Sequence, residues 1–149
     1  MEWFCHQIPE RSLLVGGEPF FLCSRCTGIY MGAFLMFLLT VRVTPPVKPA
    51  LVLFAVGILS AVLEWGGVIH TGNETRFVLG FGLGTGLLGV LQEGKHPESL
   101  WPLLFLAVAP IILLAREHPL AAPVLALTVF LGMAAVTISA YQTIREIWT

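Results

Sequence analysis

The sequence carries very little charge and contains no aspartate. Charged residues make up 11% of its 149 residues, whereas hydrophobic residues make up 56%. Soluble domains carry about 25% charged residues, so this chain has too few polar side chains to cover itself in water. Its 8 basic and 9 acidic residues nearly balance and form no basic patch, which argues against nucleic-acid binding. We therefore expect the lipid bilayer to surround it.

Two further features are missing, and each excludes a class of protein. Met1–Glu10 lacks the basic start of a secretory signal peptide, so we expect none. The apolar runs are continuous and do not alternate with polar residues, which excludes the strands of a membrane β-barrel. Helices satisfy their own backbone polar groups, as lipid requires. The apolar runs are therefore predicted to be helices.

Five apolar runs follow one another, separated by polar or proline-containing turns. They span Thr27–Val43, Ala50–Ile69, Phe77–Leu91, Leu100–Ala115 and Leu120–Tyr141. A spanning helix needs roughly 20 residues, so the shorter third and fourth runs would tilt or thin the bilayer locally. We predict an all-α, polytopic membrane helix bundle of about five transmembrane helices, with four as the alternative. It would be a single multi-pass domain in the cell membrane, with an N-terminal Cys/His cap segment (1–26) and a helix bundle (27–149).

Glycine is concentrated at helix-packing spacing in two of the runs. Gly28 and Gly32 form one G-x-x-x-G, and two overlapping ones lie between Gly80 and Gly86. Small residues at this spacing let helix backbones approach closely in lipid. Glycine is also common in membrane helices generally, but five glycines within ten residues favour close packing. We predict that the first and third helices are neighbours at the centre of the bundle.

All three cysteines lie within the first 26 residues. Cys23 and Cys26 form a C-x-x-C at the start of the first apolar run, and 16 residues separate Cys23 from Cys5-His6. Three thiolates and an imidazole suit a tetrahedral zinc site made by Cys5, His6, Cys23 and Cys26, with iron or an iron–sulfur centre as the alternative. Adjacent residues rarely bind the same ion, so either Cys5 or His6 could face elsewhere.

Other interpretations stay open. The start of a helix favours the thiolate, so Cys23 and Cys26 could exchange electrons with a quinone in a membrane thiol–disulfide oxidoreductase. They could also be a reduced pair without a ligand, and the odd cysteine count argues against a purely structural disulfide framework. A third interpretation is an accessory subunit of a membrane complex, in which the glycine-rich helices bind a membrane protein partner.

Charged residues beside the apolar runs are the remaining candidates. Glu64 lies about fifteen residues into the second run, where a charge is costly and points to function. Arg76 follows twelve residues later across a short turn, so the two could pair. The alternative is that Glu64 is an interfacial residue beside Trp65. Asn73 is predicted to cap the third helix, with Glu74 in its first turn.

Two arginines flank the cysteines and suit an anion. Arg11 and Arg25 could bind a phosphate or carboxylate, to which Ser12 would add a hydroxyl. The alternative is that both arginines extend to the membrane interface. Odd-numbered helices start on the same side of the membrane, so Arg76 lies on the side of Arg25. Together the three arginines would form a basic pocket for an anionic or lipid-linked ligand beside the metal.

The same residues carry a resemblance. The stretches "CHQIPERS" and "CSRCTGIYMG" are similar to a family of small predicted membrane proteins of bacteria and archaea. The family pattern is Cys-His-x-x-Pro-x-Arg-Ser, then Cys-x-x-Cys-Thr-Gly-x-Tyr-x-Gly, and later Asn-x-x-Arg-x-x-x-Gly-x-x-x-Gly. Many members carry an Asp-Gly before the last motif, for which Glu64-Trp65-Gly66 is a loose substitute. The resemblance covers roughly the first 85 residues and implies an integral membrane protein with one shared site, made of Cys5, His6, Arg11, Cys23, Cys26, Asn73 and Arg76.

Overall fold

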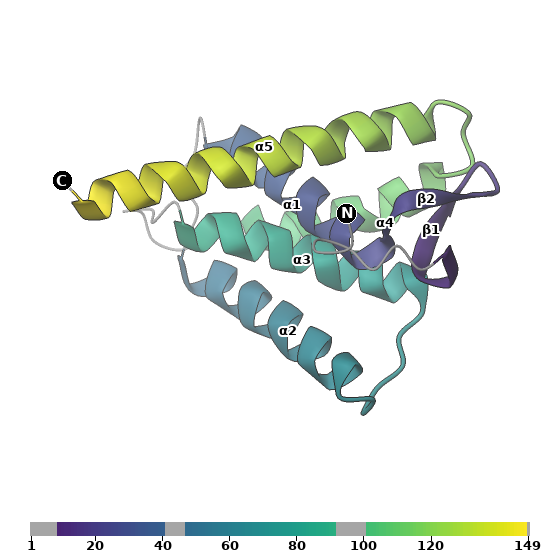
Figure 1. Cartoon of the computed structure of the whole chain (residues 1–149), viewed down its shortest axis with the longest axis horizontal. Coiled ribbons are helices and arrows are strands. Elements are labelled where there is room, and N and C mark those ends of the chain that lie inside the picture. The colour runs from purple at the N-terminus through teal and green to yellow at the C-terminus, as the bar shows by residue number, and fades with distance from the viewer. Residues whose placement is uncertain (1–8, 41–46, 92–100, 149) are drawn as a thin grey trace.

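The computed structural model describes residues 9–40, 47–91 and 101–148 (Figure 1). Its elements in chain order are η1 (Pro9–Arg11), β1 (Ser12–Val15), β2 (Glu18–Cys23), α1 (Ser24–Thr40), α2 (Val47–Trp65), α3 (Asn73–Leu91), α4 (Trp101–Ala115) and α5 (Ala121–Trp148). The predicted helical bundle of five helices is confirmed. Two boundaries differ from the prediction: α1 begins inside the predicted cap segment, and α5 continues past Tyr141.

The cap segment contains a β-hairpin, which the prediction of an all-helical chain missed. β1 and β2 pair antiparallel, with Val15 opposite Glu18. Gly16 and Gly17 form the turn with φ angles of 62° and 87°, the left-handed region that tight hairpin turns require. The hairpin lies at the end of the bundle where α1 and α3 begin (Figure 1). Its buried side chains join the hydrophobic core, and they are Leu13, Val15, Phe20 and Leu22.

Glycines bring the backbones of α1 and α3 into direct contact. A Cβ atom on Gly28 would overlap the carbonyl oxygen of Phe77, and one on Gly84 would overlap the carbonyl oxygen of Ile29. Gly32 and Gly80 are equally crowded by the opposite backbone. Such close approach is what small residues permit in a membrane bundle. The prediction that the first and third helices are central neighbours is therefore confirmed.

The other helices surround this central pair. α5 packs on α1, where Gly132 meets the backbone of Tyr30, and α2 packs on α3, where Gly86 meets the backbone of Phe54. α4 lies against α3 behind the pair in Figure 1. The protein buries 50% of the apolar α3 span but only 17% of the α2 span and 22% of the α5 span. α3 is therefore the interior helix, and α2 and α5 are peripheral.

The peripheral helices expose apolar side chains, as lipid-facing helices do. Three helices are long and apolar enough to cross a membrane: α2 over Lys48–Trp65, α3 over Asn73–Leu91 and α5 over Ala121–Arg145. α1 and α4 have 17 and 15 residues, fewer than the roughly 20 that span a bilayer. Within the described residues the structure thus supplies three candidate spans, and five spans stay a prediction.

We expect Gly84→Ser to destabilise the bundle by about 1–3 kcal/mol, the usual effect of overpacking a tight contact. The new Cβ would overlap the backbone of Ile29 and force α1 and α3 apart. Gly72→Ser is the matched control, because no atom lies within 4 Å of its added Cβ. Unfolding in dodecyl sulfate titrations of the detergent-solubilised protein measures both. Equal stability of the two variants would contradict the close helix contact.

Candidate functional site

The most distinctive polar feature is a carboxylate held by two arginines. Glu64 lies in the last turn of α2, and its side chain is only 8% exposed. Its Oε2 accepts from the guanidinium of Arg25 at the start of α1, and its Oε1 accepts from the guanidinium of Arg76 in α3. The Thr71 hydroxyl donates to Oε2 at 2.9 Å. The predicted pairing of Glu64 with Arg76 is confirmed, and Arg25 is an additional partner.

The group of Arg25, Glu64 and Arg76, called the charge cluster below, has an excess positive charge. Two guanidinium groups face one carboxylate, and the arginine side chains are 20% and 14% exposed. Partly buried ions are stable only when their partners and hydrogen bonds are complete. Hydrogen bonds between guanidinium and carboxylate groups are the strong, charge-assisted kind. The charge cluster therefore links α1, α2 and α3 at one level of the bundle.

Asn73 connects the charge cluster to the hairpin. Its Nδ2 donates to the carbonyl oxygens of Glu10 at 2.9 Å and Ser12 at 3.0 Å, and its Oδ1 accepts from Arg76 at 3.2 Å. The prediction that Asn73 caps α3 is wrong. Gly72 stands at the cap position, and its carbonyl accepts the backbone N–H of Arg76 at 2.9 Å. The Oδ1 of Asn73, which a cap would use, accepts from the Arg76 guanidinium instead.

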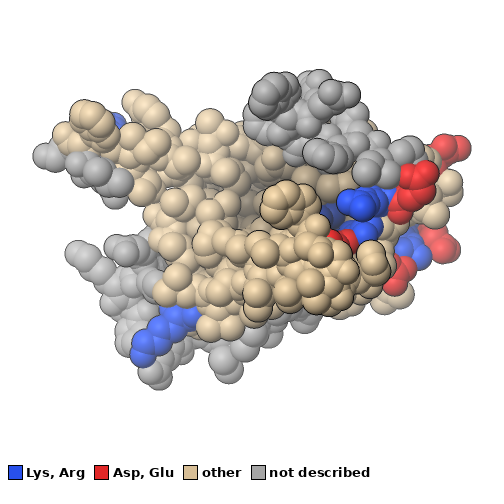
Figure 2. Space-filling model, turned by 60° about the horizontal axis from the view of Figure 1, so that its bottom comes forward, with Lys and Arg blue, Asp and Glu red and all other residues tan. Residues whose placement is uncertain are grey.

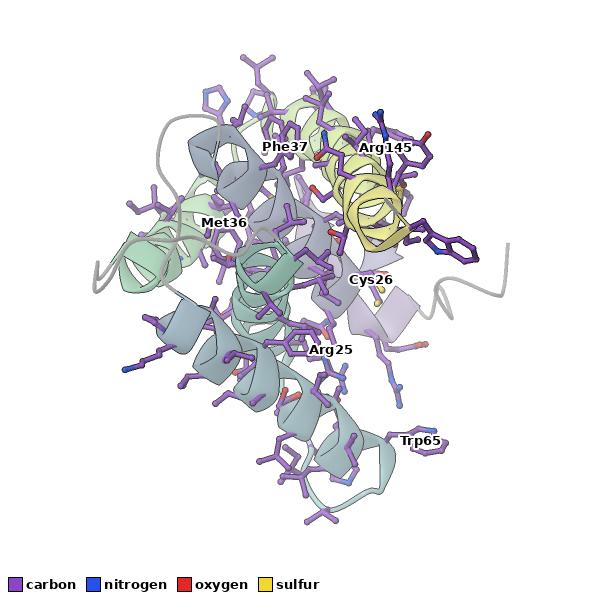
Figure 3. All side chains as sticks on the ribbon, turned by 90° about the vertical axis from the view of Figure 1, so that its left-hand side faces the viewer. Arg25, Cys26, Met36, Phe37, Trp65 and Arg145 are labelled. Carbon is purple, nitrogen blue, oxygen red and sulfur yellow. The ribbon has the colours of Figure 1, made fainter. Side chains whose placement is uncertain are left out.

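The C-x-x-C lies where β2 meets α1. Cys23 ends β2, Cys26 is in the first turn of α1, and both are half-buried. The Thr27 hydroxyl donates to the Cys23 carbonyl at 3.1 Å, which closes this first turn. Figure 3 shows Cys26 and Arg25 projecting from neighbouring positions at the start of α1. The structure thus brings the two cysteines beside the arginine that binds Glu64.

The predicted metal site falls only in part on the described residues. Cys5 and His6 lie outside them. Among the residues that the structure describes, no three His, Cys, Asp or Glu side chains form a group that could hold a metal. Cys23 and Cys26 lie on either side of Arg25 in the sequence, where β2 meets α1, and their role as ligands stays a prediction.

Arg11 and Ser12 take different environments. Arg11 is exposed at the end of η1, whereas Ser12 is buried with 3% exposure, and its carbonyl accepts from Asn73. On the face that Figure 2 shows, acidic and basic side chains of the described residues gather at this end of the molecule, and a few basic side chains lie at the other end. The charge cluster, the C-x-x-C and the hairpin therefore share one end of the bundle.

Besides the Arg25–Glu64 pair and the Asn73 hydrogen bonds, sequence reasoning missed three further contacts at this end. They are the Thr71 hydrogen bond to Glu64, the Arg116–Glu74 ion pair at 2.6 Å, and the Gly16 N–H donated to the Arg116 carbonyl at 3.2 Å. Each depends on tertiary placement of turns and helix ends. No spacing in the sequence signals any of them.

We expect Glu64→Gln to destabilise the protein by on the order of 3 kcal/mol, because two partly buried guanidinium groups lose their charged partner. Glu74→Gln is the matched control. It breaks the Arg116 pair, but Glu74 is 62% exposed and such pairs contribute little. The free energy of unfolding, measured by dodecyl sulfate titration, is compared between the two variants and the wild type. Similar losses in both would mean that the charge cluster does not hold the helices together.

Asn73→Asp should release the hairpin, because a carboxylate cannot donate to the Glu10 and Ser12 carbonyls. We expect faster hydrogen exchange of the amides of β1 and β2, with the amides of α5 as an internal reference. Hydrogen-exchange mass spectrometry of the solubilised variant and wild type measures this. Unchanged exchange in the hairpin would show that other contacts hold it in place.

Comparison with known proteins identifies the family. The model of the family described as "Predicted membrane protein (DUF2085)" matches residues 5–90, which include the hairpin, α1, α2 and most of α3. An uncharacterized protein of Methanothermobacter thermautotrophicus is 35% identical over 99 residues, covering 63% of this chain and 89% of that protein. No solved structure matches the chain. The resemblance noted in the sequence is confirmed: the chain belongs to the DUF2085 family of predicted membrane proteins.

Proposed function

We propose that this membrane protein holds a zinc ion with Cys23, Cys26, Cys5 and His6, beside an arginine site for an anionic or lipid-linked ligand. The observation that carries the proposal is the convergence of the C-x-x-C with the charge cluster at one end of the bundle. Cys23 and Cys26 flank Arg25 in the sequence, so metal and anion sites would share the start of α1.

The local structure around the C-x-x-C suits a metal. Cys23 and Cys26 are three residues apart across a strand-to-helix junction, a spacing at which two thiolates can bind one ion. The start of α1 carries a partial positive charge that stabilises thiolates. The guanidinium of Arg25, which lies between the two cysteines in the sequence, is directed to Glu64.

The remaining two ligands can reach this junction. The hairpin register puts Ser12 opposite Cys23. Cys5 and His6 precede Ser12 by seven and six residues. The 3-10 helix η1 rises about 2 Å per residue and an extended chain covers about 3.3 Å per residue, so the segment from Cys5 to Ser12 is long enough to bring either residue to Cys23. Four protein ligands would make the zinc structural, whereas three would leave a position open for Lewis-acid chemistry.

The arginines support an anionic ligand. The charge cluster retains one positive charge after Glu64 is counted, and Arg11 adds another at the exposed edge of the same end. Guanidinium groups bind phosphate and carboxylate oxygens in pairs, which gives both strength and orientation. The bilayer contributes anionic and lipid-linked molecules at this level of the protein, so these are the ligands we propose.

We expect about one zinc per chain in protein purified in mild detergent without chelator, since the ligand set suits zinc best. Cys23→Ser and Cys26→Ser should remove most of it, and Cys5→Ser or His6→Ala should lower it. His70→Ala is the control, because this exposed histidine lies outside the proposed ligand set. Elemental mass spectrometry with a thiol count on the same sample measures occupancy.

Two results would contradict the metal site. One is metal-free wild-type protein in which Cys23 and Cys26 form a disulfide or react freely with thiol reagents. The other is loss of metal in the His70→Ala control equal to that in Cys23→Ser. Iron in place of zinc would keep the site and change the ion.

A further inference from the structure

Glu64 does not accept a hydrogen bond from every buried donor of the two arginines. The carboxylate accepts from the terminal guanidinium nitrogen of Arg25, while the buried Nε of Arg25 has no acceptor among the described residues. Beside it, the fully buried Ser24 hydroxyl also lacks a partner within the same residues. Buried donors are normally hydrogen-bonded, and an orphaned one calls for an explanation. Arg25 therefore has an unused donor in the charge cluster.

The end of α2 that carries Glu64 stands away from the rest of the bundle. The first half of α2 packs tightly, with Gly57 against Leu83 of α3. Beyond Gly57, α2 diverges from α3 toward its C-terminus, as both Figure 1 and Figure 3 show. Leu59, Val62 and Trp65 in this half are 58%, 54% and 92% exposed. Glu64 thus bridges the space between the end of α2 and the two arginines. The outward-facing side chains of this end of α2 are apolar, as expected for a surface in contact with lipid.

From these two observations we propose that the Glu64 carboxylate is a built-in competitor of the headgroup phosphate of an anionic phospholipid. The phosphate would bind Arg25 and Arg76 and displace Glu64, which frees the end of α2. This inference rests on the anion site of the proposed function and adds its ligand class and its regulation. The exchange replaces one negative charge with another, so the charge of the arginine site is unchanged.

A phosphodiester fits the arginines better than the carboxylate does. Its two free oxygens can accept from Nε and a terminal nitrogen of Arg25 together, the bidentate geometry that Glu64 leaves unused. Its acyl chains would lie along the exposed apolar side chains of α2. A tethered carboxylate acts at an effective concentration of about millimolar or above, so dilute soluble phosphate competes poorly. A lipid in the same leaflet is already concentrated beside the site.

The test counts bound lipid by native mass spectrometry after the protein has been equilibrated with phosphatidylcholine alone or with added phosphatidylglycerol. The wild type should retain phosphatidylglycerol in preference. Glu64→Gln should retain roughly tenfold more of it, because the charge-assisted competitor is gone. Arg25→Gln should lose the preference, and Glu74→Gln, which alters only the exposed pair, should match the wild type. Inorganic phosphate should not displace the lipid.

The wild type provides a second measurement, which does not depend on the folding of Glu64→Gln. In nanodiscs that contain phosphatidylglycerol, the amides of 59–68 should exchange hydrogen faster than in phosphatidylcholine alone, because α2 is released. The amides of α3 are the internal reference.

Each outcome has one meaning. If Arg25→Gln loses the lipid but Glu64→Gln gains none and exchange over 59–68 is unchanged, Glu64 is not a competitor, and the anion site of the proposed function survives. If inorganic phosphate displaces the lipid, the ligand is a soluble phosphate and the lipid assignment is wrong. If the wild type shows no preference for phosphatidylglycerol and no binding of phosphate, the anion site itself fails.

Discussion

The direct backbone contact between α1 and α3 is the constraint on which the rest of the structure depends. A Cβ on Gly80 would overlap the carbonyl of Arg25, and the carbonyls of Phe77 and Ile29 press on Gly28 and Gly84 in the same way. Because Arg25 and the start of α3 meet at this contact, both arginines emerge at one level. A larger side chain between the helices would separate the two guanidinium groups that share Glu64. Packing therefore determines the chemistry of this end.

Once two arginines meet in a largely apolar bundle, they require an acid. Glu64 supplies it from α2, and Asn73 links Arg76 to the carbonyls of Glu10 and Ser12. Removal of Glu64 would leave both guanidinium groups without their carboxylate, so the members of the charge cluster act cooperatively. The segments joined in this way all lie within the family match, whereas α4 and α5 lie beyond it. α4 and α5 add packing and one exposed ion pair to a site that the first three helices complete.

The sequence predicted those contacts that leave a local pattern, such as a regular spacing or two charges on either side of a turn. The glycine spacing predicted the contact between α1 and α3, and the positions of two opposite charges on either side of one turn predicted the Glu64–Arg76 pair. Arg25 was not assigned to Glu64, because 39 residues separate them and no local pattern relates the two. The hairpin had a usable signal in Gly16-Gly17, a two-residue turn between two short apolar stretches. Asn73 does not cap α3, because its Oδ1 accepts from the Arg76 guanidinium while its Nδ2 donates to the distant carbonyls of Glu10 and Ser12.

The acid at the end of α2 shows how the charge cluster constrains sequence. The resemblance implies an Asp-Gly before the last motif, and this chain has Glu64 followed by Trp65 and Gly66. A glutamate side chain is one methylene longer than that of aspartate and can bridge a larger gap. Here the end of α2 diverges, and Glu64 spans that distance. The requirement is thus a carboxylate at the point where two guanidinium groups converge. Gly57 and Gly86 hold the first half of α2 against α3, so at its C-terminal end the Glu64 carboxylate is the link to the two arginines.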